Sequence, residues 1–246
     1  MQISIMLIVL LGGYLFGSLS LSRLVTKTIS PETNLETVEL PDRNTGGTFQ
    51  LKTVGATTAS MILGPKIGGL IGILDIIKGL LPTLVVRLIF PEEYYFLITG
   101  IAVVIGHIWP IYYRFRGGGG LSPALGMLLV FDPIGILISV VLAMIIGMFI
   151  LREISFIVMG GPIIFIFWIA IRTGNWFYIG ASIILNIILF IAVIPDVSVH
   201  LRARRDGKTD LSTSMDAIPM GQMMKKMMNR MGLSVNNKKE KPGEKE

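Results

Sequence analysis

The chain of 246 residues is 52% hydrophobic and only 15% charged, and its mean hydropathy is +0.71. This balance excludes an ordinary soluble domain and predicts an integral membrane protein whose main partner is the lipid bilayer rather than nucleic acid. The net charge of +6 is concentrated near the C-terminus, and the absence of cysteine excludes disulfides and thiol chemistry.

Seven apolar stretches are candidates for membrane-spanning helices, because a bilayer core about 30 Å thick needs roughly 20 apolar residues per helix. In chain order they are about 3–22, 66–90, 94–113, 121–131, 133–151, 155–171 and 176–194. The fourth is too short to cross alone, since Asp132-Pro133 ends it. We therefore predict an all-α, polytopic membrane domain over residues 1–200, with about seven transmembrane helices.

The distribution of lysine and arginine predicts the orientation, because these residues accumulate in cytoplasmic loops close to the spans. An N-terminus on the outside places the basic loop 23–65, Arg114 and Arg116 on the cytoplasmic side and leaves Arg172 as the outside exception. This arrangement requires an odd number of crossings. We therefore predict seven spans, with the N-terminus outside and the C-terminus cytoplasmic.

Residues 201–246 form a second region, a basic and methionine-rich cytoplasmic tail that we expect to be partly disordered. It carries half of the 22 lysine and arginine residues. Methionines at helical spacing within 220–231 predict a short helix with one apolar stripe. Such a helix fits the anionic surface of the membrane. The alternative is a pliable surface that binds a hydrophobic partner.

The junction between the third and fourth apolar stretches carries four consecutive glycines, Gly117 to Gly120, with Arg114 and Arg116 beside them. Glycines can turn their backbone N–H groups toward an anion without steric penalty, and the arginines add positive charge. The alternative interpretation is a flexible turn between two membrane helices.

Other polar residues in or beside the spans have both structural and functional interpretations. Asp75 and Lys78 are expected to pair across one helical turn, or else to contact a substrate. His107 either packs through hydrogen bonds or acts as a base. Residues 55–57 begin a helix whose free N–H groups either attract phosphate or are simply capped. Two distant histidines and no cysteine predict neither a metal nor a cofactor.

Three segments, in order, resemble the bacterial acyl-phosphate:glycerol-3-phosphate acyltransferases. Residues 55–79, which read GATTASMILGPKIGGLIGILDIIKG, are similar to the family pattern GATN-x5-G-x10-D-x2-KG. Residues 106–120, which read GHIWPIYYRFRGGGG, are similar to GHxFP-x4-FKGGKG. Upstream, Gly17-Ser18 resembles the start of the family's GSIP.

The resemblance implies an enzyme of the bacterial inner, or plasma, membrane. It implies transfer of an acyl group from acyl phosphate to glycerol 3-phosphate, which yields lysophosphatidic acid at the cytoplasmic face for phospholipid synthesis. His107 becomes the candidate catalytic residue, with the role of orienting the glycine loop. The candidate phosphate-binding residues are Gly55, Ala56, Thr57, Thr58, Arg114, Arg116, Gly117, Gly118, Gly119 and Gly120, and the candidate auxiliary cations are Lys52, His200 and Arg202.

The chain departs from the family pattern at polar positions. Leu51 replaces a serine, Thr58 an asparagine, Met61 an arginine and Gly119 the second lysine of the glycine loop. The lost groups favour an alternative function, a noncatalytic relative that binds a lipid phosphate or a membrane partner. The retained glycines and loop lengths favour the acyltransferase, which is our primary prediction. A transporter is a weaker third hypothesis, because the spans carry few charges.

Overall fold

The computed structural model describes residues 2–36, 39–41, 48–50, 53–151, 153–205, 226 and 230. The helices in this part of the chain are α1 (Ile3–Gly17), α2 (Leu21–Ile29), α3 (Ala56–Leu63), α4 (Pro65–Ile89), α5 (Tyr95–Ile108), α6 (Leu121–Phe131), α7 (Pro133–Ile145), α8 (Ile154–Thr173) and α9 (Trp176–Arg205). A 3-10 turn at Ile111–Tyr113 follows α5, and a π-helical turn at Ile146–Leu151 continues α7. Two short strands, β1 (Glu39–Pro41) and β2 (Thr48–Gln50), pair antiparallel.

Six helical segments among the described residues are long and apolar enough to cross a membrane, and they are Ile3–Ile29, Pro65–Ile89, Tyr95–Tyr113, Pro133–Leu151, Phe156–Thr173 and Trp176–Ile194. The predicted all-α, polytopic architecture is therefore confirmed. The helix α6 is apolar but has only 11 residues, so it is about 16 Å long. The first predicted stretch, 3–22, differs in detail, because α1 ends at Gly17 and α2 begins at Leu21.

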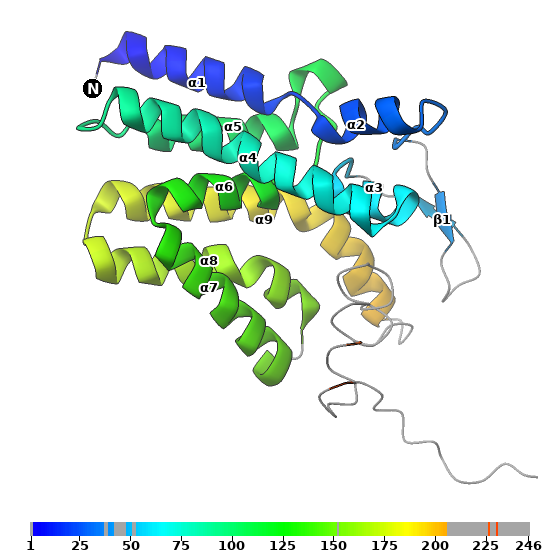
Figure 1. The fold of residues 1–246 in the computed structure, drawn as a ribbon. Coiled ribbons are helices and arrows are strands. Elements are labelled where there is room, and N and C mark those ends of the chain that lie inside the picture. Colours follow the sequence, from blue (N-terminus) through cyan, green and yellow to red (C-terminus); the bar gives the residue numbers. More distant parts are fainter. Residues whose placement is uncertain are drawn as a thin grey trace, which may run out of the picture.

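The long helices lie side by side with alternating directions (Figure 1). The closest pairs are α1 with α5, α4 with α6 and α7 with α8. A core of fully buried side chains, including Met127, Phe165 and Leu185, joins α6, α8 and α9. Large apolar side chains such as Phe167 and Ile171 are exposed on the outer surface, which is the distribution expected where lipid surrounds the bundle.

Glycines allow two helix pairs to approach closely at one end of the bundle. A Cβ added at Gly17 of α1 would lie 2.2 Å from the carbonyl oxygen of Val103 in α5. A Cβ added at Gly79 of α4 would lie 2.0 Å from the carbonyl oxygen of Pro123 in α6. Small residues permit such backbone contact in membranes, so the end of α1 packs closely against α5 and the middle of α4 packs closely against the start of α6.

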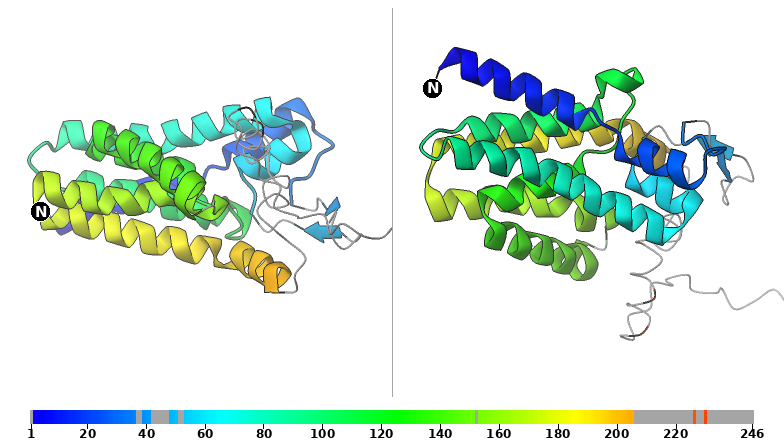
Figure 2. Two further views of the ribbon diagram at one scale, coloured as in Figure 1. Left: turned by 90° about the horizontal axis from the view of Figure 1, so that it is seen from below. Right: turned by 45° about the horizontal axis from the view of Figure 1, so that its top comes forward.

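The short elements gather at this same end of the bundle. In the views of Figure 2, α2 and the two strands lie beyond the end of α1, and α2 and α3 lie beside the beginning of α4. Leu35 and Val54 are buried among them. These segments form a polar and irregular region against the bundle, and the residues predicted to bind phosphate lie in it or beside it.

Candidate functional site

The two segments predicted to bind phosphate meet in the structure. We call residues 117–120 the glycine loop. The Val54 N–H donates a hydrogen bond to the carbonyl oxygen of Gly117 at 2.9 Å. A Cβ added at Gly55 would lie 3.4 Å from the Gly118 Cα, so the backbones are in contact there. The beginning of α3 therefore lies against the glycine loop, although the two are far apart in the sequence.

Two helices begin at this junction. Gly55 precedes α3 in an extended conformation, and Gly120 precedes α6 with φ of +81°, a left-handed value that glycine adopts readily. The first N–H groups of a helix have no acceptor within it, and the helix dipole places partial positive charge at that end. The N-termini of α3 and α6 thus provide two sets of N–H donors near one another, the arrangement that binds anions in proteins.

His107 lies in the last turn of α5 and is buried, with 8% of its surface exposed. Its Nδ1 is 2.9 Å from the Nζ of Lys78. The other edge of its ring faces the glycine loop, because a Cβ added at Gly118 would lie only 2.2 Å from Nε2. The Gly118 N–H also donates to the His107 carbonyl oxygen at 3.1 Å. His107 therefore contacts the glycine loop through its ring and through its backbone.

Lys78 joins three helices within the bundle. Its Nζ donates to the carbonyl oxygens of Gly17 at 3.1 Å and Leu19 at 2.9 Å, which the end of α1 leaves without helical partners. A protonated lysine has three N–H donors, and the Nζ of Lys78 also lies within hydrogen-bond distance of Nδ1 of His107.

The predicted pairing of Asp75 with Lys78 is present. Both side chains are almost fully buried, and Oδ1 of Asp75 lies 3.4 Å from Nζ of Lys78. The same oxygen lies 3.5 Å from Nδ1 of His107. These distances are those of ion pairs rather than short hydrogen bonds, and Oδ1 has no closer hydrogen-bond donor among the described residues. The carboxylate balances the charge of the buried lysine.

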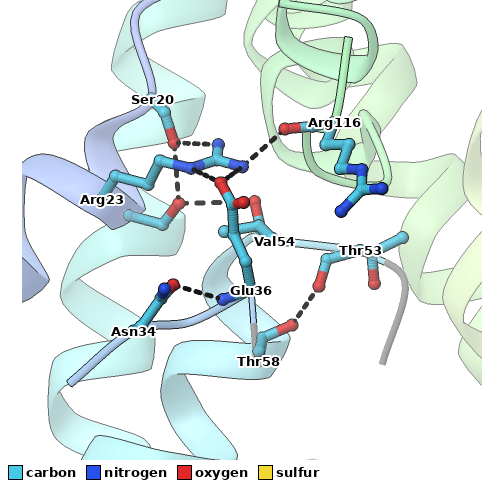
Figure 3. A network of polar contacts seen from close by, with 9 residues as sticks. Ser20, Arg23, Asn34, Glu36, Thr53, Val54, Thr58 and Arg116 are labelled. Atoms are coloured by element: carbon cyan, nitrogen blue, oxygen red, sulfur yellow. Dashed lines mark hydrogen bonds and ion pairs between the residues drawn. The ribbon is translucent and has the colours of Figure 1, made fainter. Parts of the chain in front are cut away.

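Arg23 of α2 fixes the start of the glycine loop (Figure 3). Its Nη2 donates to the carbonyl oxygen of Arg116 at 2.7 Å and to Oε1 of Glu36 at 2.8 Å. Its Nη1 donates to Oγ of Ser20 at 3.1 Å, and its guanidinium lies 4.5 Å from the centre of the Tyr113 ring. This network ties α2 and the following segment to the backbone immediately before Gly117.

Arg114 and Arg116 expose their side chains beside the glycine loop. Arg114 and Phe115 both have positive φ, at 52° and 60°, a conformation that is uncommon for residues with a Cβ. Neither guanidinium donates a hydrogen bond to another residue in the described part of the chain. Both are thus available to an anion that approaches the loop.

The remaining predicted site residues have different surroundings. Ala56 is half-buried and Thr57 is exposed at the start of α3. Thr58 is buried, and its Oγ1 donates to the carbonyl oxygen of Thr53 at 2.5 Å. Lys52 lies outside the described residues. His200 and Arg202 fall within α9, but the positions of their side chains are outside the described part of the structure.

Two residues that organise this site, Arg23 and Lys78, were not predicted to do so from the sequence. Arg23 was considered only within the basic loop 23–65 that predicts the orientation, and Lys78 was expected either to pair with Asp75 or to contact a substrate. Each donates to a backbone carbonyl that is distant in sequence, 93 residues away for Arg23 and 61 for Lys78, and no periodic pattern predicts such contacts. One available signal was the lysine itself, since a charged group within an apolar helix needs several acceptors.

Comparison with known proteins identifies similar sequences and folds. A family model described as glycerol-3-phosphate acyltransferase matches residues 7–203. A glycerol-3-phosphate acyltransferase of Myxococcus xanthus (strain DK1622) is 37% identical over 122 residues, which cover 49% of this chain and 57% of the relative. One from Legionella pneumophila (strain Corby) is 31% identical over 137 residues, which cover 55% of this chain and 45% of the relative. The chain thus spans about half the length of these relatives.

The fold is also similar to that of a solved membrane enzyme. The crystal structure of PlsY, an integral membrane glycerol 3-phosphate acyltransferase, in its glycerol 3-phosphate form has a TM-score of 0.67 at 25% identity and covers 81% of this chain and 93% of that chain. A lysophosphatidic acid form of that protein gives a TM-score of 0.66. Together with the six membrane-length helices, this similarity confirms the prediction of a multi-pass integral membrane protein.

Proposed function

The chain belongs to the glycerol-3-phosphate acyltransferase family, and on this basis we propose that it acylates glycerol 3-phosphate with acyl phosphate as the donor. A glycerol hydroxyl oxygen attacks the acyl carbonyl carbon as the bond from that carbon to the phosphate oxygen breaks. The products are lysophosphatidic acid and inorganic phosphate, which takes up the proton of the hydroxyl. Because acyl phosphate is already activated, binding and neutralising the two phosphates supplies much of the catalysis. The proposed location is the bacterial plasma membrane.

The observation that carries this proposal is the meeting of two helix N-termini at the glycine loop. A Cβ added at Gly119 has no atom within 4 Å, so there is open space beside the loop. The N–H of Gly118 is already bonded to His107, so we assign anion binding to Gly119, Gly120 and the first turns of α3 and α6. The guanidinium groups of Arg114 and Arg116 supply positive charge that balances the negative charge of the departing phosphate.

We assign His107 and Lys78 to positioning roles. The ring of His107 is enclosed between Lys78 and Gly118, so it acts on the substrate through the glycine loop rather than by contact. Lys78 holds the imidazole from the other side and ties it to the end of α1. Arg23 supports the same loop from α2 through the backbone of Arg116.

An activity assay on the full-length chain tests the proposal. Purified protein in nanodiscs is incubated with acyl phosphate and labelled glycerol 3-phosphate, and labelled lysophosphatidic acid is measured. Arg116→Gln removes a cation beside the loop and should lower kcat/KM by about 10–100-fold. Lys66→Gln removes an exposed cation at the start of α4 and should keep wild-type activity. Equal kcat/KM for Arg116→Gln and Lys66→Gln would show that the cation beside the glycine loop does not contribute to catalysis.

A noncatalytic relative is the second candidate, and the family side chains missing at Leu51, Met61 and Gly119 favour it. In that case the open space beside Gly119 holds a lipid phosphate without turnover. The same preparation distinguishes the two functions. Saturable binding of acyl phosphate or a phospholipid, lost in Arg116→Gln and without any labelled product, would establish the noncatalytic function.

We propose that the membrane domain crosses the bilayer seven times, with the N-terminus outside and the C-terminus cytoplasmic. In support, α6 begins beside the middle of α4, and Val130 near its end contacts Arg87 near the end of α4, so α6 runs along the second half of a membrane-length helix. The chain has no cysteine, which makes single-cysteine labelling clean. An impermeant maleimide should label Glu92→Cys in intact cells and Lys66→Cys only after lysis, and the reverse pattern would invert the topology.

We also propose that residues 201–246 act as a membrane-binding tail, separate from the membrane domain over 1–200. Most of this region lies outside the described residues. A chain truncated before Leu211 should keep acyltransferase activity in nanodiscs but lose binding of its tail to anionic vesicles. If activity is lost while the protein remains folded, the tail belongs to the catalytic domain. If only a hydrophobic peptide binds the tail, the alternative partner role applies.

A further inference from the structure

A second polar site lies at the opposite end of the bundle from the glycine loop. It is a cavity of about 390 Å³ bordered by Arg87, Asp132, Arg172, Asn175 and Tyr178, which we call the distal pocket. These residues come from the end of α4, the α6–α7 junction, the end of α8 and the beginning of α9, toward the end of the bundle that carries the N-terminus (Figure 1). Arg87 is nine residues beyond Lys78 on α4, which corresponds to about 14 Å.

Two guanidinium groups and one carboxylate set the charge of the distal pocket. Arg172 is paired with Asp132, with Nε 3.0 Å from Oδ2, and half of its side chain is exposed. Asp132 also accepts hydrogen bonds from the Gly135 N–H and from Nε1 of Trp168, each at 3.0 Å. The carboxylate is therefore satisfied and neutralises one arginine, which leaves a net charge of +1 among the residues that border the cavity.

Arg87 supplies the remaining charge. It donates one N–H to the carbonyl oxygen of Val130, and its guanidinium lies 5.2 Å from the centre of the Phe96 ring. A guanidinium carries five N–H donors in a planar fork, so this carbonyl bond leaves donors for a ligand. The arginines approach the cavity from two different helices, and together they can hold several oxygens of a phosphate group.

Aromatic residues place the distal pocket at the level of lipid headgroups. Trp176 and Phe177 at the beginning of α9 are 82% and 57% exposed, and Phe177 stacks on Tyr94 with ring centres 4.4 Å apart. Aromatic side chains of this kind gather at the boundary between membrane and water. Ile171, immediately before Arg172, is 89% exposed. An apolar, lipid-facing surface thus adjoins the polar cavity.

We propose that the distal pocket binds the phosphodiester headgroup of an anionic phospholipid. Arg87 and Arg172 contact the phosphate oxygens, and the acyl chains lie along the adjoining apolar surface. The single negative charge of such a headgroup matches the net charge of +1. A zwitterionic lipid has no net charge and leaves the charge of the pocket unbalanced. The two negative charges of a phosphate monoester exceed the single positive charge of the pocket. Basic pockets between membrane helices are a general means of binding anionic headgroups.

The test is lipid binding to the full-length protein in detergent, measured by native mass spectrometry and by the rise in Tm. The probes are phosphatidylglycerol, phosphatidylcholine and inorganic phosphate. The wild type should bind phosphatidylglycerol saturably at one site, with at least tenfold preference over phosphatidylcholine. Arg87→Gln and Arg172→Gln should each weaken this binding about tenfold, since each removes a charged bidentate contact. Lys66→Gln, which removes a cation from the other end of α4, should bind as the wild type does.

Further variants separate this pocket from the proposed catalytic site and from a loss of folding. Arg172→Lys keeps the positive charge of a half-exposed side chain, so the variant should fold normally. It should nevertheless bind phosphatidylglycerol several-fold more weakly, because lysine lacks the planar guanidinium fork. Arg116→Gln should leave phosphatidylglycerol binding unchanged. The proposal is wrong if Arg116→Gln weakens the binding while the Arg172 variants do not. It is also wrong if inorganic phosphate displaces the lipid, or if phosphatidylcholine binds equally well.

Discussion

Replacement of Gly118 by alanine tests directly how the glycine loop meets His107. The added Cβ would lie 2.2 Å from Nε2, whereas ordinary contact begins at 3.4 Å, so either the ring or the loop must move by more than 1 Å. The ring is held on its other edge by Lys78 at 2.9 Å, so we expect the loop to move. Overpacking of this kind costs about 1–3 kcal/mol. For a chain of this size that corresponds to a fall in Tm of about 2–4 °C per kcal/mol.

The effect on activity should exceed the effect on stability. A displacement of about 1 Å at a binding loop lowers the rate by roughly 100-fold, so Gly118→Ala should lose most of its lysophosphatidic acid formation at temperatures where it is still folded. Gly119→Ala is the matched control for stability, because its Cβ meets no atom within 4 Å. Thermal unfolding and steady-state kinetics are measured for both variants. An equal Tm for the two variants would refute the described contact with His107.

Three further predictions concern charged residues. Lys78→Met leaves the buried Asp75 carboxylate without its cation and should lower the free energy of unfolding by about 3–5 kcal/mol. The double variant Asp75→Asn/Lys78→Met should recover much of this stability, as measured by thermal unfolding. No recovery would argue against the pairing. Arg23→Lys keeps the charge but loses the planar fork, so kinetic assays should give a several-fold higher KM for acyl phosphate, and an unchanged KM would contradict loop support by Arg23. Burial raises the pKa of Asp132, but hydrogen bonds and Arg172 outweigh burial and the net pKa is lowered. The lowered pKa stabilises the fold at pH values above the unfolded pKa of about 3.9, and this stabilisation is lost as the pH falls through the folded pKa. The Tm difference between the wild type and Asp132→Asn should therefore narrow as the pH falls below about 4. A difference that stays constant with pH would contradict it.

Hydropathy predicted the long spans well, because the length and apolarity of a segment largely decide whether it can cross a membrane as a helix. The boundaries at 133–151 and 176–194 match helical segments of the structure. The first stretch, predicted as 3–22, breaks after Gly17 because the chain turns there. The free carbonyls at this break are the acceptors of Lys78. A polar residue in another helix thus helps to determine where α1 ends, and hydropathy carries no information about it.

The candidate site was only partly accessible from sequence. The glycine loop and the start of α3 were identified separately by their glycines, and the structure places them in contact through Val54 and Gly117. The roles of individual glycines were not predictable. Gly118 is packed against His107 and Gly119 faces open space, although both are the same residue type in the same run. Their difference arises from the position of α5, which depends on packing against α1 and α4.

The amino-acid sequence by itself determined that this chain is a multi-pass helical membrane protein and that glycines and arginines border its polar junction, because composition and local periodicity decide which segments leave water. Only the tertiary structure decided which of those groups meet. Helix packing brings Lys78, His107 and the end of α1 together at one end of the bundle, and brings Arg87 and Arg172 together at the other. Such contacts depend on the three-dimensional path of the chain, since the residues that form them are separated by whole helices in sequence.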